Sequence, residues 1–149
     1  MLYREDNLAP IDDPDLGRLT YGSSGWRSRQ SEGALQLHTA SGREGPDAAL
    51  RRAAVTAIGE KDPLESRARR FVETSSGWDD SRALTLAGIQ VRRITGVWIE
   101  QVVAPTRPAI AVKLRSGAPV VVLQFVIVDD ANVLDVLFID GEPFESDYH

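Results

Sequence analysis

The hydrophobic pattern is clearest over residues 109–140, where three runs of β-forming residues are separated by turn clusters at 116–117 and 129–132. The middle run, residues 120–128, is apolar on both faces of an extended chain except at Gln124. A strand that buries both faces is typical of the interior of a sheet with cover on each side. The pattern predicts a β-meander whose middle strand is central, with helices on one side and a partner or the N-terminal strands on the other.

Three shorter strands are predicted nearer the N-terminus, at residues 16–21, 26–30 and 34–39. Apolar and polar side chains alternate there, and turns rich in glycine and serine separate the runs. Residues 1–15 are polar and contain prolines, which is typical of a loosely ordered N-terminal segment. We therefore expect a single α+β domain over residues 16–149.

Two helices are predicted in the middle of the chain. Alanine, leucine and isoleucine recur at helical spacing over 49–58, after Pro46 and before the stop signal Gly59. A second helix is predicted to start at Asp62, whose side chain can cap it, and to continue to Val72.

Two further strands are expected before the meander. The first covers residues 84–91, with a bulge near Gly88. The second covers residues 97–103 and places Trp98 in the core. The expected fold class is α+β: an antiparallel sheet or meander with two helices packed on one face.

Composition narrows the class of protein. The chain has 149 residues, 42% of them hydrophobic and 26% charged, which fits one globular domain. It has no cysteine, so disulfides, thiolate catalysis and cysteine-based metal sites are excluded. The start of the chain lacks a signal-peptide pattern, and the longest nearly uncharged run, residues 118–128, is shorter than the roughly 20 residues that span a bilayer. These features predict a cytoplasmic protein without a membrane partner.

Charge is distributed unevenly along the chain. The net charge of −5 argues against nucleic acid as the main partner. No lysine or arginine follows Arg115, and the closing segment is acidic. This asymmetry has two interpretations: a face that binds a basic partner, or an acidic end that packs near the protein's own basic helices. The acidic residues concerned are Asp129, Asp130, Asp135, Asp140, Glu142, Glu145 and Asp147.

Motifs for catalysis, metal binding or cofactor binding are lacking. The only histidines are His38 and His149, too few for a zinc site. The glycines around Ser23 and Ser24 do not have the spacing of a nucleophile elbow. Residues 41–46 lack the Lys-Ser/Thr pair of a phosphate loop. We expect no enzymatic activity, no cofactor and no metal.

The acidic cluster near the N-terminus also lacks a cation-binding pattern. Asp12, Asp13 and Asp15 lack the spaced ligands, central glycine and closing glutamate of an EF-hand. They are interpreted as a solvated tail.

A few side chains could still anchor a small ligand. Arg67 and Arg70 are three residues apart on a predicted helix and could meet one anionic group. Trp78 lies in a predicted loop and is a further candidate. Arg92 and Arg93 would point to opposite faces of a strand, so at most one of them could line a pocket.

The order of elements resembles that of a known group of proteins. Leu16-Gly17-x-Leu19, Trp26 after a turn, a helical middle and a late β-meander ending at residues 139–141 resemble certain small bacterial domains of unknown function. Some of these families are thought to include immunity proteins of polymorphic toxin systems. The resemblance implies a cytoplasmic α+β protein of bacteria without known chemistry, and it assigns no functional residue.

The function expected is that of a non-enzymatic protein-binding module, such as an immunity or accessory protein that neutralises a basic partner such as a toxin. Charge complementarity would steer such a partner to the acidic end of the chain. The expected contacts are Asp129, Asp130, Glu142, Glu145 and Asp147. Two alternatives stay open: a structural or oligomeric subunit, with a homodimer formed through the meander, and a small-ligand-binding protein.

Overall fold

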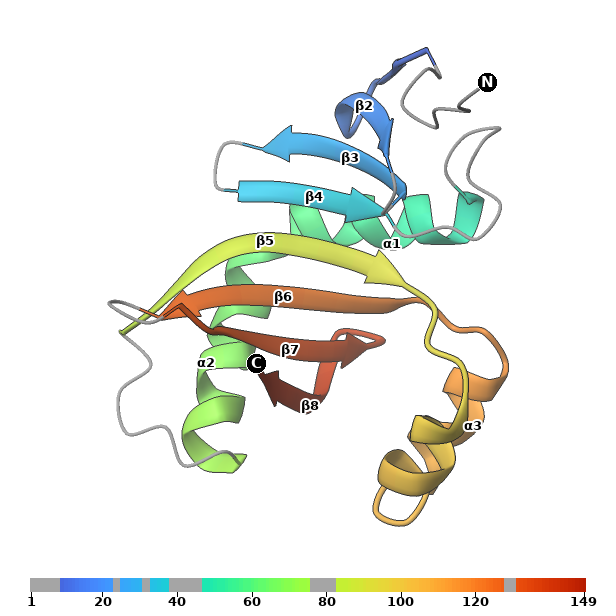
Figure 1. Cartoon of the computed structure of the whole chain (residues 1–149), viewed down its shortest axis with the longest axis vertical. Coiled ribbons are helices and arrows are strands. Elements are labelled where there is room, and N and C mark those ends of the chain that lie inside the picture. The colour runs from blue at the N-terminus through green and yellow to red at the C-terminus, as the bar shows by residue number, and fades with distance from the viewer. Residues whose placement is uncertain (1–8, 23–24, 31–32, 38–46, 76–82, 128–130) are drawn as a thin grey trace, which may run out of the picture.

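The computed structural model of the chain describes residues 9–22, 25–30, 33–37, 47–75, 83–127 and 131–149. Eight strands and four helical segments lie in this part (Figure 1). The strands are β1 (Ile11–Asp13), β2 (Gly17–Gly22), β3 (Gly25–Gln30), β4 (Gly33–Leu37), β5 (Leu84–Arg92), β6 (Val120–Ile127), β7 (Val133–Ile139) and β8 (Glu142–Tyr148). The helical segments are α1 (Ala48–Gly59), α2 (Lys61–Ser75), the short π-helical turn η4 (Ile99–Val103) and α3 (Pro108–Arg115).

The described strands form one sheet in which spatial order follows chain order from β1 to β8. All neighbouring pairs are antiparallel except β4 and β5, which are parallel. A parallel pair needs a long crossover, and α1 and α2 supply it. The α+β class predicted from the sequence is confirmed.

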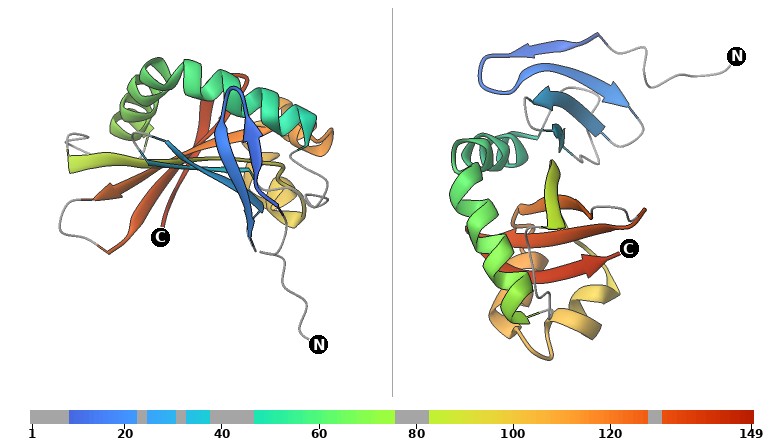
Figure 2. Two further views of the ribbon diagram at one scale, coloured as in Figure 1. Left: turned by 90° about the horizontal axis from the view of Figure 1, so that it is seen from above. Right: turned by 90° about the vertical axis from the view of Figure 1, so that its left-hand side faces the viewer.

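One face of the sheet, here called the first face, packs against α1 and α2 (Figure 2). Leu50 of α1 and Leu64 of α2 belong to the same buried cluster as Leu123 and Phe125 of β6. Each fully buried side chain of this size stabilises the fold by about 1.5–3 kcal/mol. The predicted packing of two helices on one face is therefore present.

Helix α1 begins at Ala48, two residues after the start signal at Pro46. Asp47 is the N-cap, and its Oδ1 accepts hydrogen bonds from the backbone nitrogens of Ala49 and Leu50 at 2.9 and 3.2 Å. A capping carboxylate stabilises a helix by satisfying its first amide groups.

The opposite, second face is partly covered by η4 and α3 (Figure 2). Ile99 of η4 and Leu114 of α3 are buried against Val120 and Val122 of β6 and Leu137 of β7. Strand β6 therefore buries both faces and lies between β5 and β7, which confirms its central position. The cover on the second face comes from the chain's own helices. Because β6 is an interior strand, it cannot extend the sheet into a homodimer.

Two predicted strands are helical in the structure. Residues 97–103 form a helical turn around η4, and the first run of the expected meander, residues 109–115, lies in α3. Ile99 and Val103 are four residues apart and both buried, so helical spacing places them on one apolar stripe. Burial against the sheet outweighs the β propensity of valine and isoleucine.

The meander itself consists of β6, β7 and β8. Strand β8 was not predicted, and it pairs with β7. The predicted bulge in β5 is confirmed, because the register with β6 shifts between Leu86 and Gly88.

The segment before β2 is attached to α1. Arg51 Nε and Nη2 donate to the two carboxylate oxygens of Asp13 at 2.7 and 2.9 Å, and Nη2 also donates to Asp15 at 2.8 Å. Asp13 also accepts from the backbone nitrogens of Asp15 and Leu16. The sequence pattern predicts that these two aspartates are part of a solvated tail. That prediction is wrong, because both are paired with Arg51. Residues 1–8 lie outside the described part of the chain.

Candidate binding site

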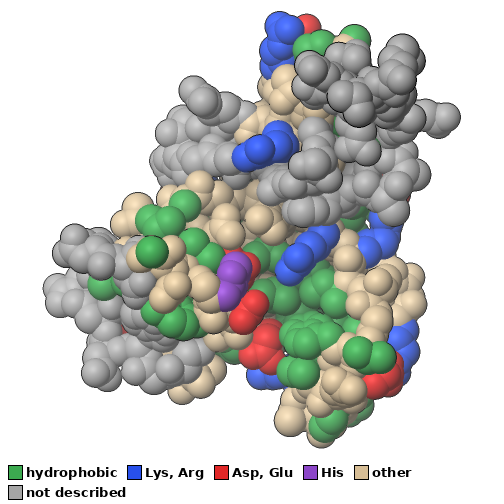
Figure 3. All heavy atoms as spheres, viewed as in Figure 1, with side chains coloured by type: hydrophobic (Ala, Val, Ile, Leu, Met, Phe, Trp, Pro, Cys, Tyr) green, Lys and Arg blue, Asp and Glu red, His purple; other side chains and the backbone are tan. Residues whose placement is uncertain are grey.

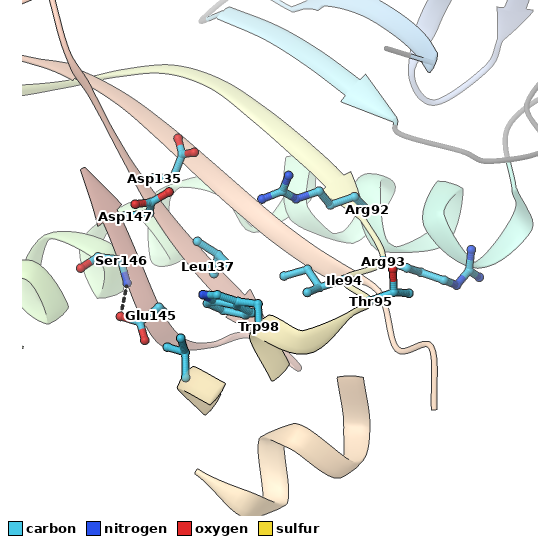
Figure 4. Close-up of a pocket in the computed structure, with 11 residues that line it drawn as sticks. Arg92, Arg93, Ile94, Thr95, Trp98, Asp135, Leu137, Glu145, Ser146 and Asp147 are labelled. Carbon is cyan, nitrogen blue, oxygen red and sulfur yellow. Dashed lines mark hydrogen bonds between the residues drawn. The ribbon is translucent and has the colours of Figure 1, made fainter. Parts of the chain in front are cut away.

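A cavity of about 570 Å³ lies on the second face, beside η4 and over β7 and β8 (Figure 4). We call it the sheet pocket. It is lined by Arg92, Arg93, Ile94, Thr95, Trp98, Val102, Asp135, Leu137, Glu145, Ser146 and Asp147. A volume of this size is typical of sites for small molecules.

Arg92 is the last residue of β5. Its neighbour Val91 is buried in the first-face core, so strand alternation puts Arg92 on the second face. Figure 4 shows the guanidinium extending from the end of β5 into the sheet pocket. Its Nε is buried and has no hydrogen-bond partner among the described residues. Leaving a buried donor unsatisfied costs about 1–3 kcal/mol, and more when the group is charged.

Asp135 enters the same pocket from β7. The residue is only 6% exposed, with Leu134 and Val136 on either side buried in the first-face core. Its Oδ2 lies 3.0 Å from His149 Nε2. Its Oδ1 is buried and, within the described ranges, has no hydrogen-bond partner. Arg92 and Asp135 thus face one cavity with opposite charges, and they form no ion pair with each other in the described structure.

The contact with Asp135 changes the ionisation of His149. The hydrogen bond to the Asp135 carboxylate raises the pKa of His149 above its usual 6.5, with smaller electrostatic contributions from Asp135 and Asp147. Partial desolvation and the positive charge of Arg92 oppose this pKa shift. The backbone of His149 also exchanges two hydrogen bonds with Val133 at 2.7 and 2.9 Å, which holds the residue beside β7.

The wall of the sheet pocket nearest η4 is apolar. Trp98 and Ile94 are half-buried and pack against the second-face core, and Leu137 lies between them and Asp135 in the close-up (Figure 4). Trp98 was expected inside a strand. It instead precedes η4 in a helical turn and presents its ring to the pocket.

Arg93 borders the pocket but turns its guanidinium away (Figure 4). Its Nε donates to the Gly117 carbonyl at 2.9 Å, and its Nη2 donates to Asp47 Oδ1 at 3.0 Å. Of the two neighbouring arginines, only Arg92 directs its charged group into the cavity. The strand alternation used for the prediction ends at Arg92, because β5 ends there.

The acidic residues predicted to bind a partner do not form one continuous surface in the described structure. Glu145 and Asp147 line the sheet pocket together with Asp135. Glu142 is exposed at the start of β8 and does not line it. Asp129 and Asp130 lie outside the described residues. In the space-filling view, a histidine side chain (purple) adjoins acidic side chains (red), with a basic side chain (blue) and apolar side chains (green) nearby (Figure 3).

Several acidic side chains are paired with the chain's own cations. Glu145 accepts from Arg107 at 3.4 Å, and Asp140 accepts from Lys113 at 2.6 Å. These contacts favour the interpretation that the acidic end is partly neutralised internally. Asp147 has no hydrogen bond or ion pair with another described side chain.

The predicted ligand anchors on α2 do not form a site in the structure. Arg67 donates to the Gly141 carbonyl at 3.1 Å, and Arg70 is exposed on the helix. Trp78 and His38 lie outside the described part of the chain. A second cavity of about 420 Å³ lies between α1, α2 and the sheet, but none of its described lining residues has a buried polar side-chain atom without a partner.

One sequence signal for the site was present. Strand β7 is apolar except for Asp135, and β6 is apolar except for Gln124. A carboxylate inside such a run is rarely buried without a functional or structural reason.

Within the described ranges, no cluster of three or more histidine or carboxylate side chains could hold a metal ion. In the same part of the chain, no helix is long and apolar enough to cross a membrane. No protein-family model, no curated protein and no solved structure matches this chain. The resemblance to small bacterial domains of unknown function, some of them thought to be immunity proteins, therefore stays a prediction.

Proposed function

We propose that this protein is a non-enzymatic binding protein that holds an anionic group of its ligand against Arg92 in the sheet pocket. The observation that carries the proposal is the buried Nε of Arg92, which has no acceptor among the described residues and belongs to a side chain that lines the cavity. A cytoplasmic location is part of the proposal.

The energetic argument is that an unsatisfied buried donor weakens the fold unless a ligand supplies its acceptor. Arginine presents its donors in a planar fork that suits a carboxylate, and such charge-assisted hydrogen bonds are stronger than neutral ones. Binding would therefore recover stability that the free protein lacks. Arg92 differs in this respect from Arg51 and Arg115, whose guanidinium groups are already paired with carboxylates.

The test compares Arg92→Met with the matched control Arg70→Met. Both variants lose one arginine, but Arg70 is exposed on α2 at the first face. A panel of small carboxylates is titrated while the melting temperature and the Nε–H signal of Arg92 are followed by calorimetry and NMR. A ligand at ten times its Kd adds about 1.4 kcal/mol, or roughly 3–6 °C for a domain of this size.

We expect the wild type and Arg70→Met to respond alike, and Arg92→Met to lose the response. An unchanged response in Arg92→Met would place any binding elsewhere. Absence of a response at millimolar concentration for every carboxylate would contradict the proposal.

A second candidate is the protein-binding function expected from the sequence, which two features of strand β8 support. Glu142 and Asp147 are exposed and make no hydrogen bond or ion pair with other side chains in the described structure. In that same part, β8 pairs with β7 alone, so its other edge is open. An open edge with unpaired acidic groups suits a basic partner.

This second candidate is tested by capture from native lysate at low and moderate salt with the double variant E142Q/D147N. A basic protein retained by the wild type and by Arg92→Met, but lost from E142Q/D147N and at higher salt, would support it. A partner whose retention does not depend on salt would argue against it.

A further inference from the structure

We infer that the ligand of the sheet pocket is a zwitterion of the amino-acid class, with a carboxylate at Arg92 and an ammonium group at Asp135. This inference rests on the proposed function and names the substrate class of the same site.

The acidic end of the pocket calls for a cation. Asp135 is 6% exposed, and its Oδ1 has no partner in the described structure, so this acceptor awaits a donor. His149 already occupies Oδ2 and reaches the carboxylate from the more exposed side. Asp147 lies directly across the ladder from Asp135 and also lines the pocket. An ammonium group has three donors and could meet both carboxylates.

The positive charge of Arg92 suits an anionic group on the ligand, and a singly charged group suits this end better than a doubly charged one. Besides Arg92, the lining carries the carboxylates of Asp135, Asp147 and Glu145, of which Glu145 is paired with Arg107 and Asp135 with His149 through one oxygen. A phosphate dianion would be repelled by the remaining carboxylates. A carboxylate joined to an ammonium group brings no net charge and satisfies both ends.

The middle of the pocket is apolar and suits a short hydrocarbon link. Figure 4 shows Leu137 between the side of the pocket where Asp135 lies and the Trp98 ring, while Arg92 extends from the other side. Methylene groups between the two charges would lie on Leu137 and Ile94.

The experiment uses calorimetric titration of the full chain with ω-amino acids of increasing length, from glycine to 6-aminohexanoate. Hexanoate and hexylamine serve as ligands with one charged end each, and inorganic phosphate as the competing anion. The chain-length series measures the separation of the two charges in the site. We expect one length to bind at least ten-fold more tightly than either ligand with a single charged end.

Variants test which residue binds each charged group of the ligand. Asp135→Asn should remove the advantage of the amino acid over hexanoate but leave hexanoate binding, whereas Arg92→Met should remove hexanoate binding. If Asp135→Asn folds poorly, Asp147→Asn tests the ammonium end instead. We expect Asp147→Asn to weaken the binding of only those ligands that carry an amine.

The outcomes separate this inference from the proposed function. Hexanoate binding as tightly as every amino acid, or phosphate binding more tightly, would overturn the zwitterion and leave anion binding at Arg92 intact. If no carboxylate of any kind binds and Arg92→Met behaves as the wild type does, both fail. An amino acid that binds equally to the wild type and to Asp135→Asn would also overturn the inference.

Discussion

Gln124 and Asp135 are cross-strand partners in the β6–β7 ladder, and Asp147 of β8 lies on the other side of Asp135. Strands β6 and β7 thus contain one polar residue each, and these two residues lie opposite each other in the ladder. Side chains directly across an antiparallel pair are close neighbours on one face. The polar row is therefore a local feature of the second face, and the sheet pocket is built over part of it.

The first prediction concerns a trade between stability and binding at Arg92. Replacing Arg92 by Met removes a buried donor that has no partner in the described structure, while keeping a flexible apolar side chain. We expect the free energy of unfolding to stay equal or to rise by about 1 kcal/mol, although ligand binding is lost. Arg70→Met should stay within about 0.5 kcal/mol of the wild type. Urea denaturation of the free proteins measures both, and a clear loss of stability in Arg92→Met would show that its guanidinium has a structural role.

The second prediction concerns acid stability and the Asp13–Arg51 contact. The hydrogen bonds from Arg51 lower the pKa of Asp13 from 3.8 to about 2. A carboxylate with a depressed pKa stabilises the fold above its unfolded pKa, and that contribution is lost as the pH falls from about 4 towards about 2. Asp13→Asn should therefore be less stable than the wild type by about 1–2 kcal/mol at pH 7.

Unfolding measured between pH 2 and pH 7 checks this prediction, with Asp12→Asn as the control because the Asp12 side chain is exposed. The difference between wild type and Asp13→Asn should narrow at the acid end. A constant difference across the pH range would mean that the charge of Asp13 is not its source.

The third prediction concerns His149. Its pKa is raised mainly by the hydrogen bond to Asp135. A group with a raised folded-state pKa contributes stability below its unfolded pKa of about 6.5, and the contribution is lost as the pH rises through the folded value. His149→Gln should thus be less stable than the wild type at pH 5.5, with the difference shrinking by pH 8.5.

An NMR titration of the His149 ring measures the pKa directly. Asp135→Asn should lower it, because the largest cause of its elevation is removed. An unchanged pKa in that variant would contradict the contact.

The fourth prediction concerns the turn between β7 and β8. Asp140 and Gly141 have φ angles of 52° and 78°, the positive values that a two-residue hairpin of type I′ requires. A Cβ at Gly141 would make only an ordinary van der Waals contact, 3.5 Å from Nη1 of Arg67, so the cost of a side chain there comes from the positive φ. Gly141→Ala should therefore lower stability by about 1 kcal/mol or more.

Gly59 at the end of α1 is the matched control, because a Cβ there meets nothing within 4 Å and its φ is not positive. Gly59→Ala should be neutral or stabilising by about 0.4–1 kcal/mol. Thermal unfolding of the two variants side by side makes the comparison, and equal effects would contradict the turn geometry.

The pattern of residues determined the parts of the fold that depend on local periodicity. Strands β2, β3 and β4, helices α1 and α2, the bulge in β5 and the buried strand β6 all follow from spacing along the chain, whereas β1 lies in the segment expected to be loosely ordered. Strand β8 also had a local signal, the dipeptide Asp140-Gly141, because both positions of its turn need positive φ. The sequence prediction did not use it.

Only the tertiary structure decided the state of residues 97–115 and the composition of the site. Valine and isoleucine favour strands, but Ile99 and Val103 are buried as a helical stripe against the second face of the sheet. Arg92, Trp98, Asp135 and Asp147 come from separate elements, and register and packing alone bring them to one cavity. Residue types and local spacing were readable from the chain, whereas the meeting of distant side chains depends on how the sheet pairs and what covers it.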